Sequence, residues 1–117
     1  MTNCVFCDLA NGNSEKVFRH HPGSVVHFEP LNPVTPGHML FVPKQHVESA
    51  SEEPIVTANV FYRAADYANE KKRNASDFNL ITSAGTNATQ TVFHLHVHYV
   101  PRRPNDGLHL PWTGQIK

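Results

Sequence analysis

The sequence predicts an α+β domain on an antiparallel sheet of about five strands with two helices. Several short apolar runs of strand length are bounded by proline and glycine. One long stretch after Ser51 repeats its apolar residues every three or four positions, as an amphipathic helix does. Residues 94–98 alternate histidine with apolar side chains, which is the period of a strand. At 117 residues the chain suits one domain, residues 1–117.

The first half of the chain predicts one short helix and three strands. Residues 4–10 can form the helix, closed by Asn11, Gly12 and Asn13, residue types that tolerate a left-handed helix end. The strands are expected over residues 15–20, 24–29 and 39–43. The apolar run 39–43 is typical of a buried strand. In the strand 24–29, His27 is expected on the surface. Prolines at 30, 33 and 36 force an extended loop between them.

The second half predicts a long helix and a hairpin. Ser51 can cap the helix and Pro54 suits its first turn, and its apolar face is formed by Val56, Val60, Ala64 and Tyr67. Three basic residues, 71–73, complement the negative end of this helix. Strands over residues 78–82 and 91–100 then form the hairpin.

Charge and hydropathy exclude several classes of partner. Ten basic and ten acidic residues give a formal net charge of zero, which argues against a general nucleic-acid or acidic membrane surface. No apolar run reaches the roughly 18 residues of a membrane span, and the N-terminus lacks a secretory signal pattern, so a cytoplasmic location is expected. With two cysteines, a disulfide framework is not predicted.

The alternating histidines are the feature with the most chemistry. On a strand His94, His96 and His98 share one face, with neighbours about 6.6 Å apart and the outer pair about 13 Å apart. Two neighbours can therefore converge on one phosphate or metal, but all three cannot converge on one atom. The flanking apolar residues argue against an affinity tag or a solvent-facing strand. The pattern leaves open a metal-ligand strand or a nucleophile strand, since neutral imidazole serves both.

The run Q-T-V-F-H-L-H-V-H-Y-V-P-R, residues 90–102, resembles the signature of the histidine triad superfamily. Further blocks match in order and spacing: C-V-F-C at residues 4–7, N-P-V-T-P-G-H at 32–38, V-P-K-Q-H at 42–46 and N-L-I at 79–81. The resemblance covers nearly the whole chain and implies this family's α+β fold.

The resemblance implies an enzyme that cleaves nucleoside phosphoramidates or dinucleoside polyphosphates at the α-phosphate. The middle histidine, His96, would form the nucleotidyl-histidine, with the backbone around His94 fixing its tautomer. His98 would donate to a phosphate oxygen, where charge stabilisation matters most. The substrate, a purine nucleotide or nucleotidyl conjugate, would be bound with help from Thr91, Gln90, Ser83 and Asn32.

The zinc-bearing branch of the family implies a metal site. Its ligands map to Cys4, Cys7, His46 and His94, and two thiolates with two imidazoles make a closed, structural Zn²⁺ site. No organic cofactor is expected. The C-x-x-C pair alone could also be a redox pair or two ordinary cysteines, and the two histidines serve as hydrogen-bonding groups in zinc-free relatives.

The chain departs from the family pattern near the nucleotide. Pro30 stands where relatives carry an acidic residue for the ribose, and the adjacent Glu29 would point the other way in an extended segment. Ser83 replaces an asparagine, and Thr89 replaces a glycine at a turn where backbone approaches phosphate. His38 matches a family position at which a structural hydrogen bond is expected.

Two other functions remain open at the level of sequence. A metal-dependent hydrolase would hold a catalytic ion between triad histidines, although no H-E-x-x-H motif or carboxylate cluster supplies its base. A zinc-stabilised nucleotide-binding domain would keep the fold without turnover. The family resemblance also implies a homodimer. The same expectation follows from the long helix, because Phe61 and Ala65 widen its apolar surface beyond the Val56, Val60, Ala64 and Tyr67 face.

Overall fold

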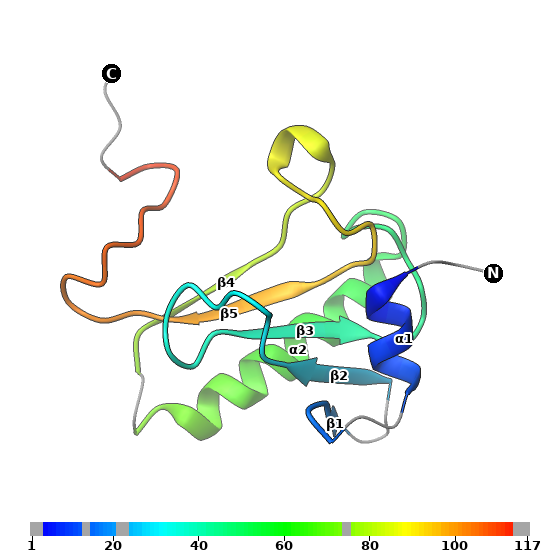
Figure 1. The fold of residues 1–117 in the computed structure, drawn as a ribbon, viewed down its shortest axis with the longest axis horizontal. Coiled ribbons are helices and arrows are strands. Elements are labelled where there is room, and N and C mark those ends of the chain that lie inside the picture. The colour runs from blue at the N-terminus through cyan, green and yellow to red at the C-terminus, as the bar shows by residue number, and fades with distance from the viewer. Residues whose placement is uncertain (1–3, 13–14, 21–23, 74–75, 114–117) are drawn as a thin grey trace.

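The computed structural model describes residues 4–12, 15–20, 24–73 and 76–113. Figure 1 shows a sheet with one long helix behind it and a short helix in front of one end. The elements are, in order, α1 (Val5–Asn11), β1 (Phe18–His20), β2 (Val25–Phe28), β3 (Met39–Pro43), α2 (Pro54–Lys71), β4 (Phe78–Ile81), the 3₁₀ turn η1 (Thr86–Ala88) and β5 (Val97–Pro101).

The five strands form one sheet in the order β1-β2-β3-β5-β4, and each neighbouring pair is antiparallel. The α+β class, the five strands and the two helices predicted from the sequence are thereby confirmed. The bounds of β3 agree with the predicted 39–43, since a short apolar run between Gly37 and Lys44 leaves little freedom. β1 and β2 are shorter than predicted.

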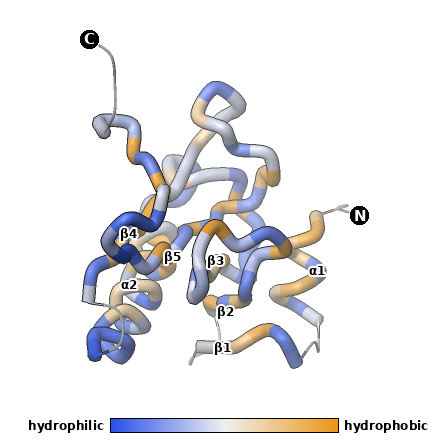
Figure 2. Tube along the Cα trace, turned by 60° about the vertical axis from the view of Figure 1, so that its left-hand side comes forward, coloured by the Kyte–Doolittle hydropathy of each residue, from blue (hydrophilic) through white to orange (hydrophobic). Residues whose placement is uncertain are grey.

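The two faces of the sheet bury different clusters. Side chains two apart on a strand share a face, so β5 sends Val97 and Tyr99 toward α2 and His98 toward the other side. The α2 side buries Val25, Phe41, Val47, Val60, Ala64, Ala68, Leu95, Val97 and Tyr99. The α1 side buries Phe6, Ala10, Val17, Val26, Phe28, Leu40 and Val42. Figure 2 shows these hydrophobic stretches along the strands and α1, whereas the end of α2 is hydrophilic.

The long helix begins later than predicted. Ser51 does not cap it: α2 starts at Pro54, and Glu53 at the N-cap position makes no side-chain capping bond. The reason is that a residue before proline is pushed away from helical angles, whereas proline itself suits the first helical position. Among the described residues, no helix is long and apolar enough to cross a membrane.

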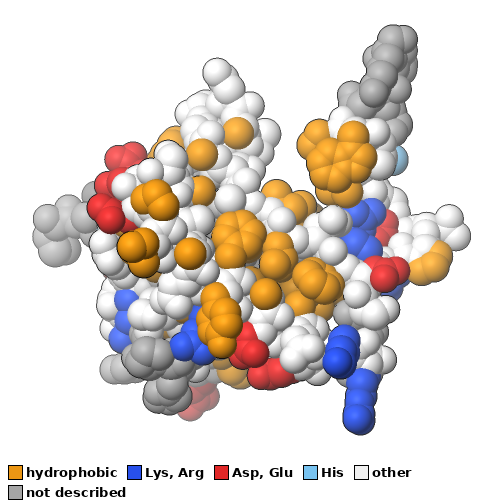
Figure 3. Space-filling model, turned by 180° about the vertical axis from the view of Figure 1, so that it is seen from behind, with side chains coloured by type: hydrophobic (Ala, Val, Ile, Leu, Met, Phe, Trp, Pro, Cys, Tyr) orange, Lys and Arg blue, Asp and Glu red, His pale blue; other side chains and the backbone are white. Residues whose placement is uncertain are grey.

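The apolar face of α2 is used within the chain itself. Val60 and Ala64 are buried in the core, and Tyr67 packs against Phe41 and Tyr99. These residues therefore cover the sheet, whereas Ala65, which also suggested a dimer, is exposed. A different row remains exposed on the outer side of α2, where Figure 3 shows hydrophobic side chains in a band. Its exposed members are Ile55, Ala58, Tyr62 and Ala65.

The last strand is shorter than predicted. β5 begins at Val97 instead of residue 91, because its partners on β3 and β4 reach only as far as Val97 and His98. The segment before it is held by other bonds, among them the Leu95 N–H donating to the Val47 carbonyl at 2.8 Å. Alternating apolar residues indicate which side chains share a face, but they do not indicate whether a neighbouring strand is there to pair with.

Two smaller expectations also fail. Gly12, which ends α1, has extended angles and not left-handed ones. Glycine is required at position 12 because a Cβ there would lie 2.8 Å from the Asp8 carbonyl oxygen. Asn13 lies outside the described residues. His27 is buried, not on the surface, because its ring stacks on Phe18 and on Phe41.

Candidate active site and metal centre

The three alternating histidines lie on the side of the sheet that α1 covers at one end. Only His98 belongs to β5; His94 and His96 lie in the extended segment before it. The ring of Phe6 in α1 meets both His94 and His96 edge-on, with centroids 6.1 Å and 5.1 Å away. The His96 and His98 rings are neighbours, 5.2 Å between centroids. His94 turns instead toward the two cysteines.

One hydrogen bond defines the tautomer of His96. Its Nδ1–H donates to the carbonyl oxygen of His94 at 2.8 Å, since a carbonyl can only accept. The Nε2 atom of a neutral ring then carries a free lone pair. Burial lowers the pKa of His96, while the bond to the carbonyl opposes this shift. The ring is therefore neutral near pH 7, with Nε2 available.

His98 has its tautomer set through a second histidine. The Val34 N–H donates to Nδ1 of His38 at 3.1 Å, so a neutral His38 carries its proton on Nε2. This Nε2–H donates to Nδ1 of His98 at 2.9 Å. His98 is left with a proton on Nε2, which makes this atom a donor. Burial lowers the pKa of His98 to about 4, with His96 and His38 contributing.

The backbone of this segment has a side-chain anchor as well. The Thr82 hydroxyl, just after β4, donates to the carbonyl oxygen of His96 at 2.7 Å. Neither Thr82 nor the pairing of His38 with His98 was identified from the sequence. The expected hydrogen bond at His38 is present, but its partner lies 60 residues away, and no local pattern encodes such a contact.

The four residues expected to bind metal lie together. One ligand atom from each of Cys4, Cys7, His46 and His94 lies within 4.8 Å of the others, and this is the group that could hold a metal ion in the part of the chain that the structure describes. α1 creates half of the group, because Cys4 is its N-cap and Cys7 follows in the first turn. The Cys7 N–H donates to the Cys4 sulfur at 3.3 Å.

The spacing of the donors fits a tetrahedral zinc ion. Zn–N distances near 2.0 Å and Zn–S distances near 2.3 Å imply N–N and N–S separations of roughly 3.3 to 3.6 Å. The Nδ1 atoms of His46 and His94 are 3.2 Å apart, and Nδ1 of His94 is 3.4 Å from each cysteine sulfur. The Nε2–H of His94 donates to the Pro43 carbonyl at 2.8 Å, which leaves Nδ1 free to bind the ion. The residues present therefore fit Zn²⁺.

The loop before the histidines is held by Gln90. This buried side chain accepts from the Gly85 N–H at 2.8 Å and donates to the carbonyls of Glu48 and Val92. These hydrogen bonds of the Gln90 side-chain amide are all made with protein backbone. Thr89, next to it, adopts left-handed angles with φ of +73°, which are unusual for a β-branched residue.

The other expected substrate residues lie at exposed or half-buried positions. Thr91 and Asn32 are exposed and Ser83 is half-buried. Within the described residues, no side-chain hydrogen bond joins these three to the histidines. Glu29 raises the pKa of His38 against the larger effect of burial, so its carboxylate lies within electrostatic reach of that ring.

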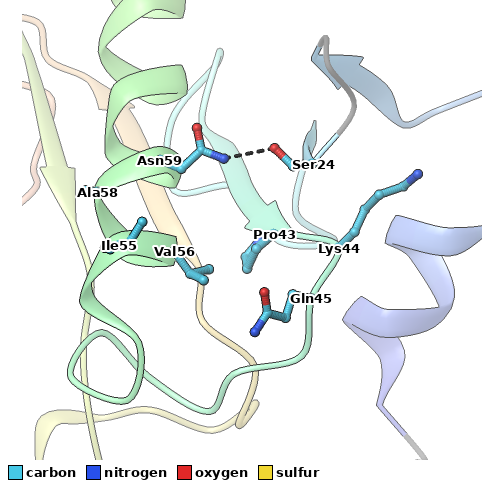
Figure 4. Close-up of a pocket in the computed structure, with 8 residues that line it drawn as sticks. All are labelled: Ser24, Pro43, Lys44, Gln45, Ile55, Val56, Ala58 and Asn59. Carbon is cyan, nitrogen blue, oxygen red and sulfur yellow. Dashed lines mark hydrogen bonds between the residues drawn. The ribbon is translucent and has the colours of Figure 1, made fainter.

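A separate pocket of about 730 Å³ lies between the start of α2 and the end of β3. Figure 4 shows its lining and the hydrogen bond from the Asn59 amide to the Ser24 hydroxyl, 2.8 Å long. None of its lining residues belongs to the expected catalytic, substrate or metal sets. Its lining is Ser24, Pro43, Lys44, Gln45, Ile55, Val56, Ala58 and Asn59.

Comparison with known proteins agrees with this geometry. The HIT domain family model matches residues 11–105. A crystal structure of a Streptococcus mutans protein is 32% identical, with a TM-score of 0.83, and the match covers 100% of this chain and 76% of that one. A zinc-bound histidine triad family protein from Mycobacterium smegmatis is 30% identical, with a TM-score of 0.80 and coverage of 92% and 80%.

A curated relative carries an enzyme name. An adenylylsulfatase of Arabidopsis thaliana is 31% identical over 109 residues, which make up 91% of this chain and 55% of the plant protein. With the family model spanning most of the sequence and these relatives matching nearly all of it, the chain belongs to the HIT, or histidine triad, family.

Proposed function

We propose that this chain is a nucleotidyl hydrolase that cleaves nucleoside phosphoramidates, dinucleoside polyphosphates or related conjugates at the α-phosphate. The observation that carries the proposal is the 2.8 Å hydrogen bond from His96 Nδ1–H to the His94 carbonyl. It leaves a neutral imidazole with a free Nε2 lone pair, which is what a nucleophilic histidine requires. The HIT family hydrolase from Legionella pneumophila and the plant adenylylsulfatase support the same reaction class.

The reaction would proceed in two displacements. Nε2 of His96 attacks the α-phosphorus, and the bond to the leaving group breaks with its electron pair going to that group. The Nδ1–H of the phosphorylated ring is stabilised by the His94 carbonyl. A departed amine takes up a proton from solvent. Water then attacks phosphorus and gives a proton to solvent, and the Nε2–P bond breaks with its pair returning to nitrogen. His98 Nε2–H donates to a phosphoryl oxygen in both steps, where charge accumulates.

The zinc ion would act on folding instead of on the substrate. Cys4, Cys7, His46 and His94 would supply the four ligands of a tetrahedral Zn²⁺, which would cross-link α1 and the histidine segment. This arrangement favours the phosphohistidine route over a metal-dependent hydrolase, because four protein ligands leave no open position for substrate.

The remaining assignments follow from this role. We propose that Gln90 shapes the phosphate loop through its three backbone contacts, and that Thr91, Ser83 and Asn32 contact a purine nucleotide or nucleotidyl conjugate. We also propose that the protein is located in the cytoplasm and forms a homodimer. The chain then needs no organic cofactor for the two displacements.

Mass spectrometry of the intact protein tests the proposal. After brief exposure to adenosine phosphoramidate, the protein should gain the mass of one adenylyl group, and the adduct should disappear as AMP is released. Release of AMP with no adduct at any time, or turnover abolished by a chelator while the fold persists, would favour the metal-dependent route. Binding without release of AMP would favour a nucleotide-binding domain.

A further inference from the structure

The proline-rich loop between β2 and β3 is fastened to the segment after β5 by one arginine. Arg103 Nη1 donates to the hydroxyl oxygen of Thr35 at 2.9 Å, and Nη2 donates to the Pro36 carbonyl at 3.1 Å. Thr35 is buried, although Arg103 itself is exposed. Two parallel donors from one guanidinium hold the loop in position and orientation, which a single bond would not do.

The loop fastened in this way also sets the tautomer of His38. The His38 N–H donates to the Thr35 carbonyl at 3.1 Å, which closes a tight turn, and the Val34 N–H donates to His38 Nδ1. The turn lies directly against β5: a Cβ on Gly37, whose φ is +91°, would come within 3.1 Å of Pro101. The position of the Val34 N–H therefore depends on how firmly this turn is held.

We propose that Arg103 is a positioning residue that keeps the Nε2–H of His98 directed at the phosphate by holding the Thr35–His38 turn. The chain of contacts runs from Arg103 to Thr35, from the turn to His38, and from His38 Nε2–H to His98 Nδ1. The proposal rests on the proposed function for its catalytic consequence. Its structural part, control of a tautomer, stands independently.

Loss of the arginine contacts releases the second tautomer. Without the Val34 N–H on Nδ1, a neutral His38 can carry its proton there and accept at Nε2. His98 would then protonate Nδ1, and its Nε2 would become a lone pair that repels a phosphoryl oxygen. Every ring remains neutral in this exchange, so the effect differs from a titration.

The experiment uses full-length Arg103→Ala and Thr35→Val, which removes only the hydroxyl acceptor. Thr35→Ser, which keeps that hydroxyl, should restore wild-type behaviour, and Arg73→Ala at the exposed end of α2 is the matched control. Nitrogen-15 NMR should show Nδ1-protonated His98 in the first two variants only. Their kcat for adenosine phosphoramidate should fall about ten- to a hundredfold with KM nearly unchanged, because only the fraction of molecules that keep the Nε2–H tautomer of His98 retains the donor.

The possible results distinguish a failure of the positioning role of Arg103 from a failure of the proposed hydrolase function. A wild-type tautomer and an unchanged kcat in both variants would overturn the positioning role. A raised KM with unchanged kcat would also overturn it, because Arg103 would then contact substrate directly. If the wild type shows no turnover at all, the proposed function fails, and the NMR tautomer alone still decides the role of Arg103. If Arg103→Ala does not fold, the His98 tautomer and the kcat of Thr35→Val decide whether the positioning role holds.

Discussion

At the scale of single residues, the site depends on histidines kept neutral by burial. Desolvation penalises the charged imidazolium more than the neutral ring, and each neighbouring histidine would add repulsion if it were charged. The pKa of His98 is lowered to about 4 in the folded protein for these two reasons. A neutral ring has one donor and one acceptor, so its hydrogen bonds determine which nitrogen faces the substrate.

This shift predicts how stability depends on pH. Between pH 6.5 and about 4, the unfolded chain protonates His98 while the folded chain does not. The unfolded state then binds more protons, so the free energy of unfolding should be flat from about pH 7 upward and fall as the pH drops through this window. Urea titrations at a series of pH values measure the slope. His98→Asn should reduce it, and an unchanged slope in that variant would show that other groups dominate.

Thr89 holds a conformation that costs free energy. Left-handed angles at a non-glycine residue cost about 1–3 kcal/mol, and Asn tolerates them better than Thr. Thr89→Asn should therefore raise the free energy of unfolding by about 1 kcal/mol, measured by urea denaturation. Thr86→Asn, an exposed change in the same loop, is the control and should have little effect. Equal stability in the wild type and Thr89→Asn would mean that this backbone is not strained.

At the scale of elements, α1 meets the histidine segment through the cysteine–histidine group and through the ring of Phe6. The helix has seven residues, too few for stable helix formation on its own. Phe6 and Ala10 bury its inner face, and its N-cap and first turn supply Cys4 and Cys7 to the group that could hold a metal. Since His94 belongs to the group that could hold a metal and its carbonyl accepts from His96, order at a metal bound there would extend to the proposed nucleophile.

Metal loss should therefore affect both the fold and the catalytic ring. We expect purified protein to contain one zinc ion per chain, and Cys4→Ser with Cys7→Ser should lose it and melt at a lower temperature. Elemental analysis and thermal denaturation are the measurements. Asp8→Asn, on the exposed side of the same helix, should keep the metal. Protein prepared without chelators that contains no zinc would contradict this prediction.

Sequence reasoning succeeded where local pattern decides the structure. The bounds of β3 and the class of α2 follow from apolar runs and periodicity, and the metal residues came together as their family positions implied. It failed where a distant partner decides. The N-terminal limit of β5 depends on its neighbours in the sheet, and the His38–His98 and Arg103–Thr35 contacts join residues 60 and 68 positions apart.

At the scale of the whole molecule, an edge strand and an exposed apolar row stand out among the described residues as surfaces open to a partner. β4 is an edge strand of the sheet, and its Phe78 is partly exposed. The outer row of α2 exposes 85% of Ile55 and 61% of Tyr62. Open strand edges and contiguous apolar surfaces both favour association. A second copy of the chain could cover both features, which supports the proposed homodimer.

A charge in that row should separate the copies. Tyr62→Glu would bury a carboxylate in an apolar interface, so light scattering at micromolar concentration should show a species of 13.1 kDa instead of a dimer. Asn87→Glu, an exposed change in η1, should leave the dimer intact. A wild-type protein that is already monomeric under these conditions would contradict the homodimer.

The central claim is that His96 is the nucleophile, and single-turnover labelling with a nucleotidyl phosphoramidate tests it most directly. Peptide fragmentation should place the adenylyl group on His96. His96→Ala should keep its zinc and its melting temperature but form no adduct, whereas His98→Ala should still label, about a hundred- to a thousandfold more slowly. A label on any other residue, or undiminished turnover in His96→Ala, would show that the assignment is wrong.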